Sequence, residues 1–419
     1  MKMDSNNKFI NVKGTRDILP EEAVMWRRME EIIRKNMENY NYKELRLPTF
    51  EYTELFRKST GEDTELVQKQ MYTFQDKGGR SLTLKPEGTP PVARMYLQYG
   101  LKNKSPLQKF YYIERMFRQE KPQKGRYREF SSYGAEAIGS ASAETDAELI
   151  KSALDIMDEL GIKGIELNIN SIGCPKCRVE FIKQLKKFLE PKLDSLCEDC
   201  KQRFSTNPLR IMDCKVDKDK LTDAPVPLDY ICDDCEMHFS MLKKYLDYLN
   251  VHYVVNRKLV RGLDYYTKTV FEFVHSKLGA QDEVGGGGRY DGLIKFMGGE
   301  DTPASGYAVG MDRMLLLMPE APKHKGIDVF VVTLDKESDI IGWKLLSLLR
   351  EGGFSADKDS LGRSMKAQFR EADRQDATWT IIIGEEERER GVVQLKKMET
   401  GEQKEVPSDI ESIKEEIKC

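Results

Sequence analysis

The sequence predicts an α+β protein in which an antiparallel sheet flanked by helices carries an inserted domain and is followed by a small α/β domain. Its 419 residues are too many for one ordinary domain, so we expect two or three. Residues 108–139 form two β-prone runs around a loop rich in Gly, Pro and charge, which predicts a long antiparallel hairpin. From about residue 326, strand-like and helix-like segments alternate, which is typical of an α/β domain.

The composition describes a soluble globular protein, with 39% hydrophobic and 33% charged residues. No run of apolar residues is long enough for a membrane span, and the first residues lack the apolar core of a signal peptide, so we expect a cytoplasmic protein. The formal net charge of −3 means that a nucleic-acid partner would need local basic patches. The four histidines lie outside the hairpin and the glycine-rich segment, so the chemistry is expected to depend on placed charges more than on proton transfer.

The N-terminal part predicts a helix, a strand and a short hairpin. Pro20 is suited to the first position of the helix, and residues 25–37 carry Met and Ile at helical spacing. Pro48 cannot donate to a central ladder, so the strand around it is expected at a sheet edge, where a dimer contact is one use. A hairpin around Gly78 and Gly79 leads into a turn that holds Glu87. Taken alone, that turn is better explained as a simple entry to the next helix than as a binding site.

The central hairpin, residues 108–139, carries the best candidate for a nucleotide site. Period-two alternation in its second strand places Phe130, Ser132, Gly134 and Glu136 on one face, which offers a ring for stacking, room for a ligand and a carboxylate. The density of cations around the loop suits a polyphosphate, although a solvated charged tip would explain an isolated loop as well. These cations are Arg115, Arg118, Lys121, Lys124, Arg126 and Arg128.

Residues 171–255 differ in character from their surroundings and are interpreted as an inserted domain. They contain paired cysteines in Cys-x-x-Cys spacing, and a chain without an export signal is not expected to use them in disulfides. A structural Zn²⁺ site and reduced structural thiols explain the pairs about equally well, and more candidates exist than the four places of a zinc site. The candidates are Cys174, Cys177, Cys197, Cys200, Cys232 and Cys235.

A second stretch with charged and aromatic residues follows the inserted segment. Residues 257–274 have β-prone composition, and a cluster of Arg261, Asp264, Tyr265 and Tyr266 within a strand would need a ligand or ion partner. Four consecutive glycines then precede Arg289 and are tolerable where the backbone approaches something closely; a flexible linker is the alternative.

A strand-to-helix junction and a basic cluster complete the candidates. Arg313 is predicted in the first turn of an apolar helix, where a cation opposes the helix dipole, so it is expected to face an anion. In the C-terminal domain, a cluster of Lys and Arg between residues 358 and 370 is the best candidate for a nucleic-acid patch, and a solvated helix face explains it almost as well.

Taken together and in order, these motifs resemble those of class II aminoacyl-tRNA synthetases, and within that class the match extends to the histidyl-tRNA synthetase family. The resemblance covers nearly the whole chain from Lys13 and rests on the segments KGTRDILP, LKPEGT, MFRQEKPQKGRYREF, LVRGLDYYTKTVFEFV, GGGGRYDG and GMDR. RGLDYY and GGRYDG are the most specific of these segments.

The resemblance implies a homodimeric histidine–tRNA ligase that activates L-histidine with ATP and Mg²⁺ and transfers it to the histidine tRNA. It implies a class II catalytic domain in two parts, residues 1–170 and 256–325, an inserted domain at 171–255 and an anticodon-binding domain at 326–419. By position, Arg118, Arg126 and Arg313 would hold ATP, Phe130 would stack on adenine, and Arg261 and Arg118 would act in catalysis. The implied histidine-binding residues are Glu87, Thr89, Ser132, Glu136, Arg261, Tyr265, Tyr266 and Tyr290.

The sequence departs from the family pattern at one position of consequence. Where the family usually has Phe-His-Gln, this chain has Phe130-Ser131-Ser132, so the Gln that contacts the amino acid is replaced by Ser. One rival hypothesis is a class II synthetase of another specificity, against which Glu136, Tyr266 and Tyr290 argue. The other is a catalytically inactive paralogue that binds histidine as a regulatory subunit. The intact RGLDYY segment and the complete C-terminal domain argue against that paralogue.

Overall fold

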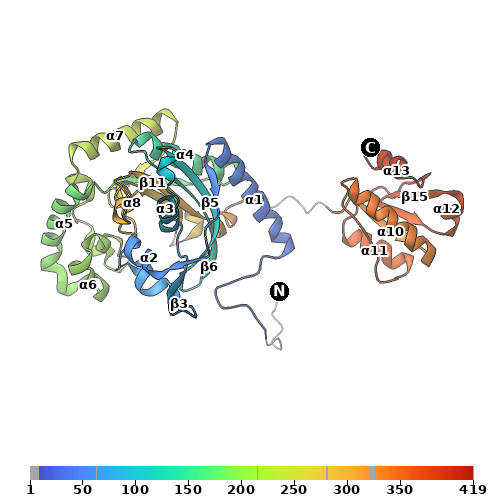
Figure 1. Cartoon of the computed structure of the whole chain (residues 1–419), viewed down its shortest axis with the longest axis horizontal. Coiled ribbons are helices and arrows are strands. Elements are labelled where there is room, and N and C mark those ends of the chain that lie inside the picture. The colour runs from blue at the N-terminus through green and yellow to red at the C-terminus, as the bar shows by residue number, and fades with distance from the viewer. Residues whose placement is uncertain (1–8, 63, 215, 280–281, 321–325, 419) are drawn as a thin grey trace. The chain divides into compact units, whose positions relative to one another are not determined.

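The computed structural model describes residues 9–62, 64–214, 216–279, 282–320 and 326–418. The chain divides into two compact units, Met1–Glu320 and Ala321–Cys419, whose elements are labelled in Figure 1.

The first unit is built on a large sheet with the strand order β1-β5-β6-β11-β10-β9-β7-β8. Neighbouring strands are antiparallel from β5 through β7, and the outer strands β1 and β8 join in parallel. The predicted antiparallel-sheet domain is thereby confirmed. The strands are β1 (Lys43–Leu45), β5 (Gln108–Phe117), β6 (Glu129–Ile138), β7 (Glu166–Ser171), β8 (Val254–Val255), β9 (Thr267–Val274), β10 (Glu283–Arg289) and β11 (Ala304–Gly310).

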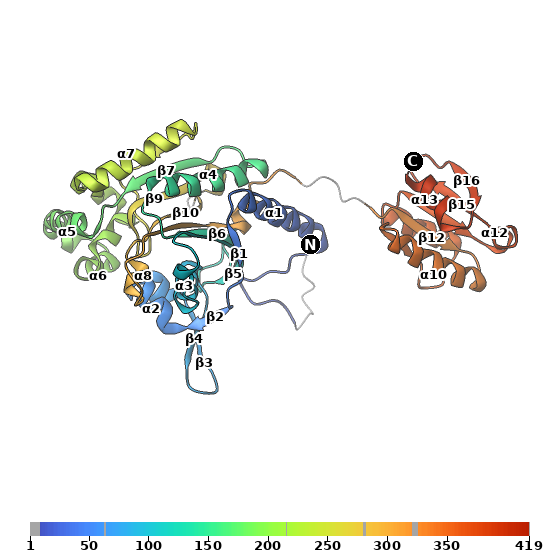
Figure 2. The same cartoon turned by 45° about the horizontal axis from the view of Figure 1, so that its top comes forward.

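Helices cover both faces of this sheet because its strands alternate apolar side chains between two cores. Tyr111 and Tyr133 belong to a core with α1, α4 and α7, whereas Tyr112 belongs to a second core with α3 and α8. Figure 2 shows α4 and α7 on one side of the sheet and α3 and α8 on the other. The helices of this unit are α1 (Pro20–Asn39), α2 (Thr53–Thr60), α3 (Thr89–Gln98), α4 (Ala143–Glu159), α5 (Pro175–Leu189), α6 (Glu198–Thr206), α7 (Asp233–Tyr248), α8 (Leu293–Phe296) and α9 (Met311–Leu315).

The predicted hairpins are confirmed, whereas two predicted strands are wrong in extent. The strand expected around Pro48 is divided: β1 lies at the edge of the large sheet, and β2 (Phe50–Tyr52) pairs in a small sheet with β4 (Ser81–Leu84) and β3 (Tyr72–Gln75). The strand expected from residue 257 begins only at Thr267, because residues 262–265 bend and turn before it. Arg261 therefore lies on a loop rather than in a strand.

The four-glycine segment is a central strand, so the flexible-linker alternative is wrong. A Cβ atom at Gly286 would lie 2.6 Å from the Phe271 carbonyl oxygen and 2.9 Å from Nη1 of Arg261. Real Cβ atoms do not approach other atoms so closely, and the absence of a side chain lets the arginine lie against the strand.

The segment from residue 171 to 255 contributes to two different cores. Phe181, Leu185 and Leu189 of α5 pack with Leu209 and Ile211 in a core of their own. In contrast, the apolar face of α7 packs in the main core with α4. The division of the first unit at residues 171 and 255 remains a prediction.

The second unit is an α/β domain, as predicted. Its sheet has the order β13-β12-β14-β15-β16, with α10 packed on one face and α11 on the other. The sequence did not predict β16 or the short α12. The elements are β12 (Val329–Thr333), α10 (Lys336–Glu351), β13 (Ala356–Lys358), α11 (Met365–Arg374), β14 (Trp379–Ile383), α12 (Glu385–Arg390), β15 (Val392–Lys397), β16 (Gln403–Pro407) and α13 (Ile410–Lys418). Across the described residues, none of the helices combines the length and apolar character that crossing a bilayer requires.

Candidate active site

The predicted site residues converge on a cavity of about 370 Å³ on the face of the large sheet that carries Phe130. Most of them line it, although they come from segments more than two hundred residues apart. The lining residues predicted from the sequence are Glu87, Thr89, Arg118, Arg126, Phe130, Ser132, Arg261, Tyr265, Tyr266 and Arg313. Glu136 and Tyr290 are buried behind this lining, where Glu136 accepts hydrogen bonds from Tyr290 and from Thr89 at one end of the cavity.

That end of the cavity, the carboxylate end, is formed by Glu87, Glu136 and the hydroxyl groups around them. The Glu87 carboxylate accepts hydrogen bonds from Thr60 Oγ1 and Tyr265 Oη, both at 2.8 Å. Burial raises the pKa of Glu87 above its ordinary value, while these two hydroxyls and the Arg118 charge act in the opposite direction. Burial has the largest effect on the Glu87 pKa. The two hydroxyls are neutral donors, which stabilise a carboxylate less than a directly paired cation does.

The Glu136 carboxylate also accepts hydrogen bonds from hydroxyl groups, and its side chain is completely buried. Its Oε1 accepts from Thr89 Oγ1 at 2.7 Å and its Oε2 from Tyr290 Oη at 2.5 Å, and Tyr112 Oη lies 3.5 Å from Oε1. Burial raises the pKa of Glu136 to about 8, against the effect of these hydrogen bonds. A carboxyl group that titrates near neutral pH can accept from or donate to an imidazole ring placed above it.

The opposite end, the arginine end, is lined by cations from the hairpin and from α9. Arg118 Nε donates to the Pro86 carbonyl oxygen at 2.9 Å, and its guanidinium carbon lies 5.5 Å from the centre of the Phe130 ring. Arg126 Nη1 lies 3.3 Å from the Glu120 carboxylate. Burial, followed by the positive charge of Arg126, lowers the pKa of Arg313. Two cations that repel each other across a cavity favour an anion between them.

Arg261 lies between two carboxylates at the edge of the glycine strand. Its Nη1 is 2.6 Å from Glu283 Oε1 and 3.6 Å from Glu272 Oε1. Opposing charges at Glu283, Tyr266 and Glu272 raise the Arg261 pKa against the effect of its burial. Arg261 itself keeps the Glu283 pKa low, at about 2, in spite of burial. The guanidinium is therefore fixed in place and charged, as electrostatic stabilisation of a reacting phosphate requires.

Ser132 lies on the cavity wall with its hydroxyl group engaged by the backbone. Ser132 Oγ donates to the Val309 carbonyl oxygen on β11 at 3.0 Å, and the residue is buried. The residue lines the cavity.

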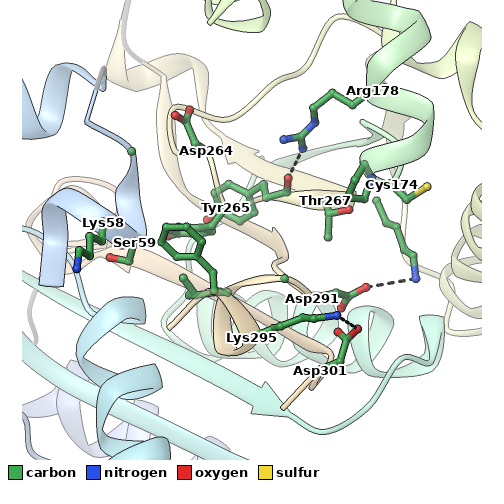
Figure 3. A pocket seen from close by; sticks show the side chains of 17 residues that line it. Lys58, Ser59, Cys174, Arg178, Asp264, Tyr265, Thr267, Asp291, Lys295 and Asp301 are labelled. Atoms are coloured by element: carbon green, nitrogen blue, oxygen red, sulfur yellow. Dashed lines mark hydrogen bonds and ion pairs between the residues drawn. The ribbon is translucent and has the colours of Figure 1, made fainter. Parts of the chain in front are cut away.

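A second cavity, of about 680 Å³, shares the wall formed by Tyr265 and Tyr266 (Figure 3). Lys58, Arg178 and Asp291 line its other sides. The two cavities share only the tyrosines among the predicted site residues. The arginines and Glu87 line the smaller cavity, so we assign the chemistry to the smaller cavity.

Comparison with known proteins agrees with this geometry. The family model described as "Histidyl-tRNA synthetase" matches residues 14–314, and the one described as "Anticodon binding domain" matches residues 328–419. The chain belongs to the histidyl-tRNA synthetase family.

Relatives in this family match the chain over almost its whole length. "Histidine--tRNA ligase" of Alkaliphilus oremlandii is 47% identical over 96% of this chain and 97% of its own, and that of Halothermothrix orenii is 47% identical over 94% and 96%. The apo histidyl-tRNA synthetase structure from S. aureus is 37% identical and has a TM-score of 0.83, covering 98% of this chain and all of its own. The fold predicted from the resemblance to class II synthetases is confirmed.

Several residues at the site are not predicted by the sequence patterns. Glu272 and Glu283 lie on neighbouring strands, and only the register of β9 and β10 brings both to Arg261. Tyr112 lies under Gly88 and Gly134, where a Cβ atom would strike its ring. Arg210 of the inserted segment also lines the cavity and donates to the Gly262 carbonyl oxygen. Alternation along β5 could have found Tyr112, but no local signal points to Arg210.

The structure sorts the cysteine candidates into two groups. Cys174, Cys177, Cys232 and Cys235 gather in one place, so the first and third pairs come together. The second pair, Cys197 and Cys200, gathers instead with Cys214 and Asp217, which the spacing had not selected.

The basic cluster of the second unit is smaller than its sequence suggested. Lys358 is paired with Asp339 at 3.2 Å, and Arg363 with Asp359 and Glu371. Lys366 and Arg370 are exposed, and within the described residues neither forms an ion pair. These two side chains are what remains of the predicted patch.

Proposed function

We propose that this chain is a histidine–tRNA ligase that forms histidyl-adenylate from histidine and ATP and transfers the histidyl group to its tRNA. The observation that carries the proposal is a single cavity lined by arginines and by Glu87 and Thr89, with Glu136 and Tyr290 buried behind Thr89. Such a cavity suits a polyphosphate next to an amino acid with a hydrogen-bonding ring. Relatives of 45–47% identity that bear the name histidine–tRNA ligase support it.

The first step follows from the placement of charge. The histidine carboxylate attacks the α-phosphorus of ATP, a P–O bond forms, and the bond to pyrophosphate breaks. Negative charge increases on the α-phosphate oxygens, and the fixed guanidinium of Arg261 lies on the lining where that charge would be stabilised without reorganisation. Arg118, Arg126 and Arg313 hold the remaining phosphates, and Phe130, with Arg118 over its ring, offers a stacking surface for adenine.

Histidine would be recognised at the carboxylate end. In this proposal, Glu87 and Thr89 bind the α-amino group, and Glu136, Tyr266 and Tyr290 bind the ring. Glu272 and Glu283 also line the cavity, and their oxygens are of the type that Mg²⁺ prefers. When bound, Mg²⁺ would supply positive charge that neutralises the charge of the phosphates.

The second unit would bind the tRNA anticodon. Leu334 and Leu361 are exposed where the chain leaves the parallel strands β12 and β13, and Ile340 is exposed in α10. Apolar side chains can pack against unpaired bases, while Lys366 and Arg370 can contact phosphates. The protein is expected to act in the cytoplasm, where its tRNA is charged.

We also propose a homodimer. Phe50, Tyr52 and Phe74 of the small sheet are exposed, and the Phe50 and Phe74 rings meet edge to face at 6.3 Å. Large exposed rings on a short sheet are typical of an interface. Sedimentation of the purified chain should give twice the chain mass.

Histidine-dependent exchange between ATP and pyrophosphate tests the activation step. The full chain should catalyse exchange with histidine and not with other amino acids. A protein that binds histidine but never catalyses exchange would be the regulatory paralogue, and the proposal would be wrong.

The division of labour between the units is tested by a chain that ends at Glu320, the boundary of the first unit. It should retain exchange and lose most aminoacylation, because it lacks the anticodon contacts. Its tRNA binding should depend less steeply on salt, since fewer phosphates are neutralised. Equal aminoacylation by both chains would contradict the assignment of the second unit.

A further inference from the structure

The cysteine pairs share one local structure. Cys174, Cys197 and Cys232 each stand immediately before a helix, at the N-caps of α5, α6 and α7, and none of these caps has a side-chain hydrogen bond to the backbone. The second cysteine of each pair lies in the first turn. Both cysteines of a pair therefore lie at the N-terminal end of a helix. The helix dipole is positive at that end and stabilises the thiolate that a metal binds.

The first group brings two such helix starts together. Cys177 Sγ lies 3.6 Å from Cys174 Sγ and 3.8 Å from Cys235 Sγ, and the Cys232 backbone N–H donates to Cys177 Sγ at 3.1 Å. A disulfide needs about 2.05 Å between sulfurs. Four sulfurs around Zn²⁺ at about 2.3 Å are separated by about 3.8 Å, the edge of the tetrahedron.

The second group has three sulfurs and one carboxylate. Cys214 Sγ lies 3.8 Å from Cys197 Sγ and 3.8 Å from Asp217 Oδ2, against roughly 3.6 Å expected between sulfur and oxygen ligands of zinc. The side chain of Asp217 is buried, and the Cys197 backbone N–H donates to its Oδ2 at 2.9 Å. Lys220 Nζ donates to the other oxygen, Oδ1, at 2.9 Å. Residues that ligate a metal are commonly oriented by such hydrogen bonds from neighbouring groups, and this bond orients the Asp217 carboxylate.

We propose that the chain binds two structural zinc ions, one through Cys174, Cys177, Cys232 and Cys235 and the other through Cys197, Cys200, Cys214 and Asp217. In each group all the ligand atoms lie within 4.8 Å of one another, which one tetrahedral ion accommodates. Thiolate-rich tetrahedral sets favour zinc over Mg²⁺ or Ca²⁺, which prefer oxygen.

Each site would support a different part of the wall of the active site. The first closes the segment between residues 174 and 235 at its base, next to Arg178, which donates to the Tyr266 carbonyl oxygen (Figure 3). The second fixes the turn that follows α6, from which Asn207 Nδ2 donates to Asp264 Oδ1 at 2.7 Å and Arg210 to the Gly262 carbonyl oxygen. Both sites therefore hold the loop that carries Arg261 and the paired tyrosines.

The decisive measurement is the zinc content of the full chain, purified without chelator, by elemental analysis. We expect about two zinc ions per chain. Cobalt exchanged into the protein should show the intense visible bands of tetrahedral thiolate sites. A zinc-free protein with unaltered folding, or cobalt spectra typical of octahedral oxygen ligands, would overturn the proposal without recourse to any variant.

Single substitutions separate the two sites. Cys232→Ser retains a residue that caps helices well while it removes the thiolate, and it should lower the content to about one zinc. Asp217→Ala should remove the zinc of the second site and also leave about one zinc per chain. Asp217→Cys replaces the carboxylate with a thiolate and should bind two zinc ions, as the wild type does. Ser205→Ala, an exposed position on α6, is the matched control and should leave the content unchanged.

The pattern of losses also decides between two sites and one. Loss of one zinc by each variant, with loss of both in the double variant, supports two separate ions. A wild-type content of about one that either variant abolishes would overturn the two-site assignment.

Discussion

The two ends of the active-site cavity keep their charges in different ways. At the arginine end, cations are paired with carboxylates or repel one another: Arg261 faces Glu283, whereas Arg313 faces Arg126. At the carboxylate end, Glu87 and Glu136 are surrounded by the hydroxyl groups of Thr and Tyr. The first end is prepared for an anion that brings its own charge, and the second for a polar ligand that brings a hydrogen-bonding ring and an ammonium group.

This difference predicts different responses to mutation and pH. Fixed guanidinium groups remain charged at any pH at which the protein folds, so the arginine end should affect the rate of the chemical step. Burial raises the pKa of Glu87 and brings the pKa of Glu136 to about 8, so the carboxylate end should affect histidine affinity and the pH dependence of stability.

The largest effect is expected from Arg261→Ala. Loss of one pre-positioned donor to a transition-state charge typically costs about 10²–10³ in rate, so kcat for pyrophosphate exchange should fall by that factor while ATP binding changes little. Arg261→Lys keeps the charge near Glu283 and should recover part of the rate. Exchange at the wild-type rate in the Ala variant would refute the role of Arg261.

Glu136→Gln should act on the other end. The substitution preserves shape but removes an acceptor that can carry charge, and loss of such a hydrogen bond costs about 1.5–3 kcal/mol, or roughly 10- to 150-fold in affinity. The KM for histidine should rise by that factor with little change in kcat. Glu129→Gln, on the same strand but paired with Arg115, is the control. A fall in kcat at unchanged KM would place Glu136 in the chemical step instead.

The same residue predicts how stability depends on pH. The ordinary Glu pKa is 4.5 and that of folded Glu136 is about 8, so between these values the folded chain keeps a proton that the unfolded chain has lost. The contribution is complete below pH 4.5 and is lost as pH rises towards 8. The free energy of unfolding of the wild type, relative to Glu136→Gln, should fall by up to about 1.4 kcal/mol per pH unit in this window. Parallel pH profiles for the two proteins would contradict it.

The smallest effect is expected from Ser132→Gln. The longer side chain can reach the histidine ammonium directly, where Ser132 leaves room for a bridging water that preserves much of the bond. The KM for histidine should fall by up to about tenfold, because a neutral hydrogen bond contributes about 1 kcal/mol and one to a charged group more. Discrimination against other amino acids should remain, because the substitution leaves the proposed ring-binding residues Glu136, Tyr266 and Tyr290 unchanged. Loss of activation would indicate a pocket shaped for another ligand.

Sequence patterns predicted the parts of the fold that depend on local alternation. The face of Phe130, Ser132, Gly134 and Glu136 follows from period two along a single strand and is present in β6. Arg313 follows from a strand-to-helix junction and lines the cavity as expected. In both cases the sequence pattern and the structural feature that it predicts belong to the same short segment.

The site contacts that local patterns do not predict depend on the register between strands and on segments far apart in the sequence. The sequence pattern predicts a strand at Arg261 because β-branched and aromatic residues surround the turn at residues 262–265. Glu272 and Glu283 meet Arg261 only through pairing of β9 with β10. Cys214 belongs to no Cys-x-x-Cys pair, so a search by spacing passes over it although the fold brings it to Cys197.

The order of strands in the large sheet also has a consequence for synthesis on the ribosome. β6 ends at Ile138, but its neighbour β11 begins at Ala304, so β6 emerges long before the strand that completes it. At translation rates of about 5–20 residues per second, this interval lasts on the order of ten seconds. We expect nascent chains arrested before residue 304 to expose the open edge of β6 and to bind chaperones, and chains arrested well beyond residue 320 to resist proteolysis. Protease resistance of the shorter chains would show that the sheet can close without β11.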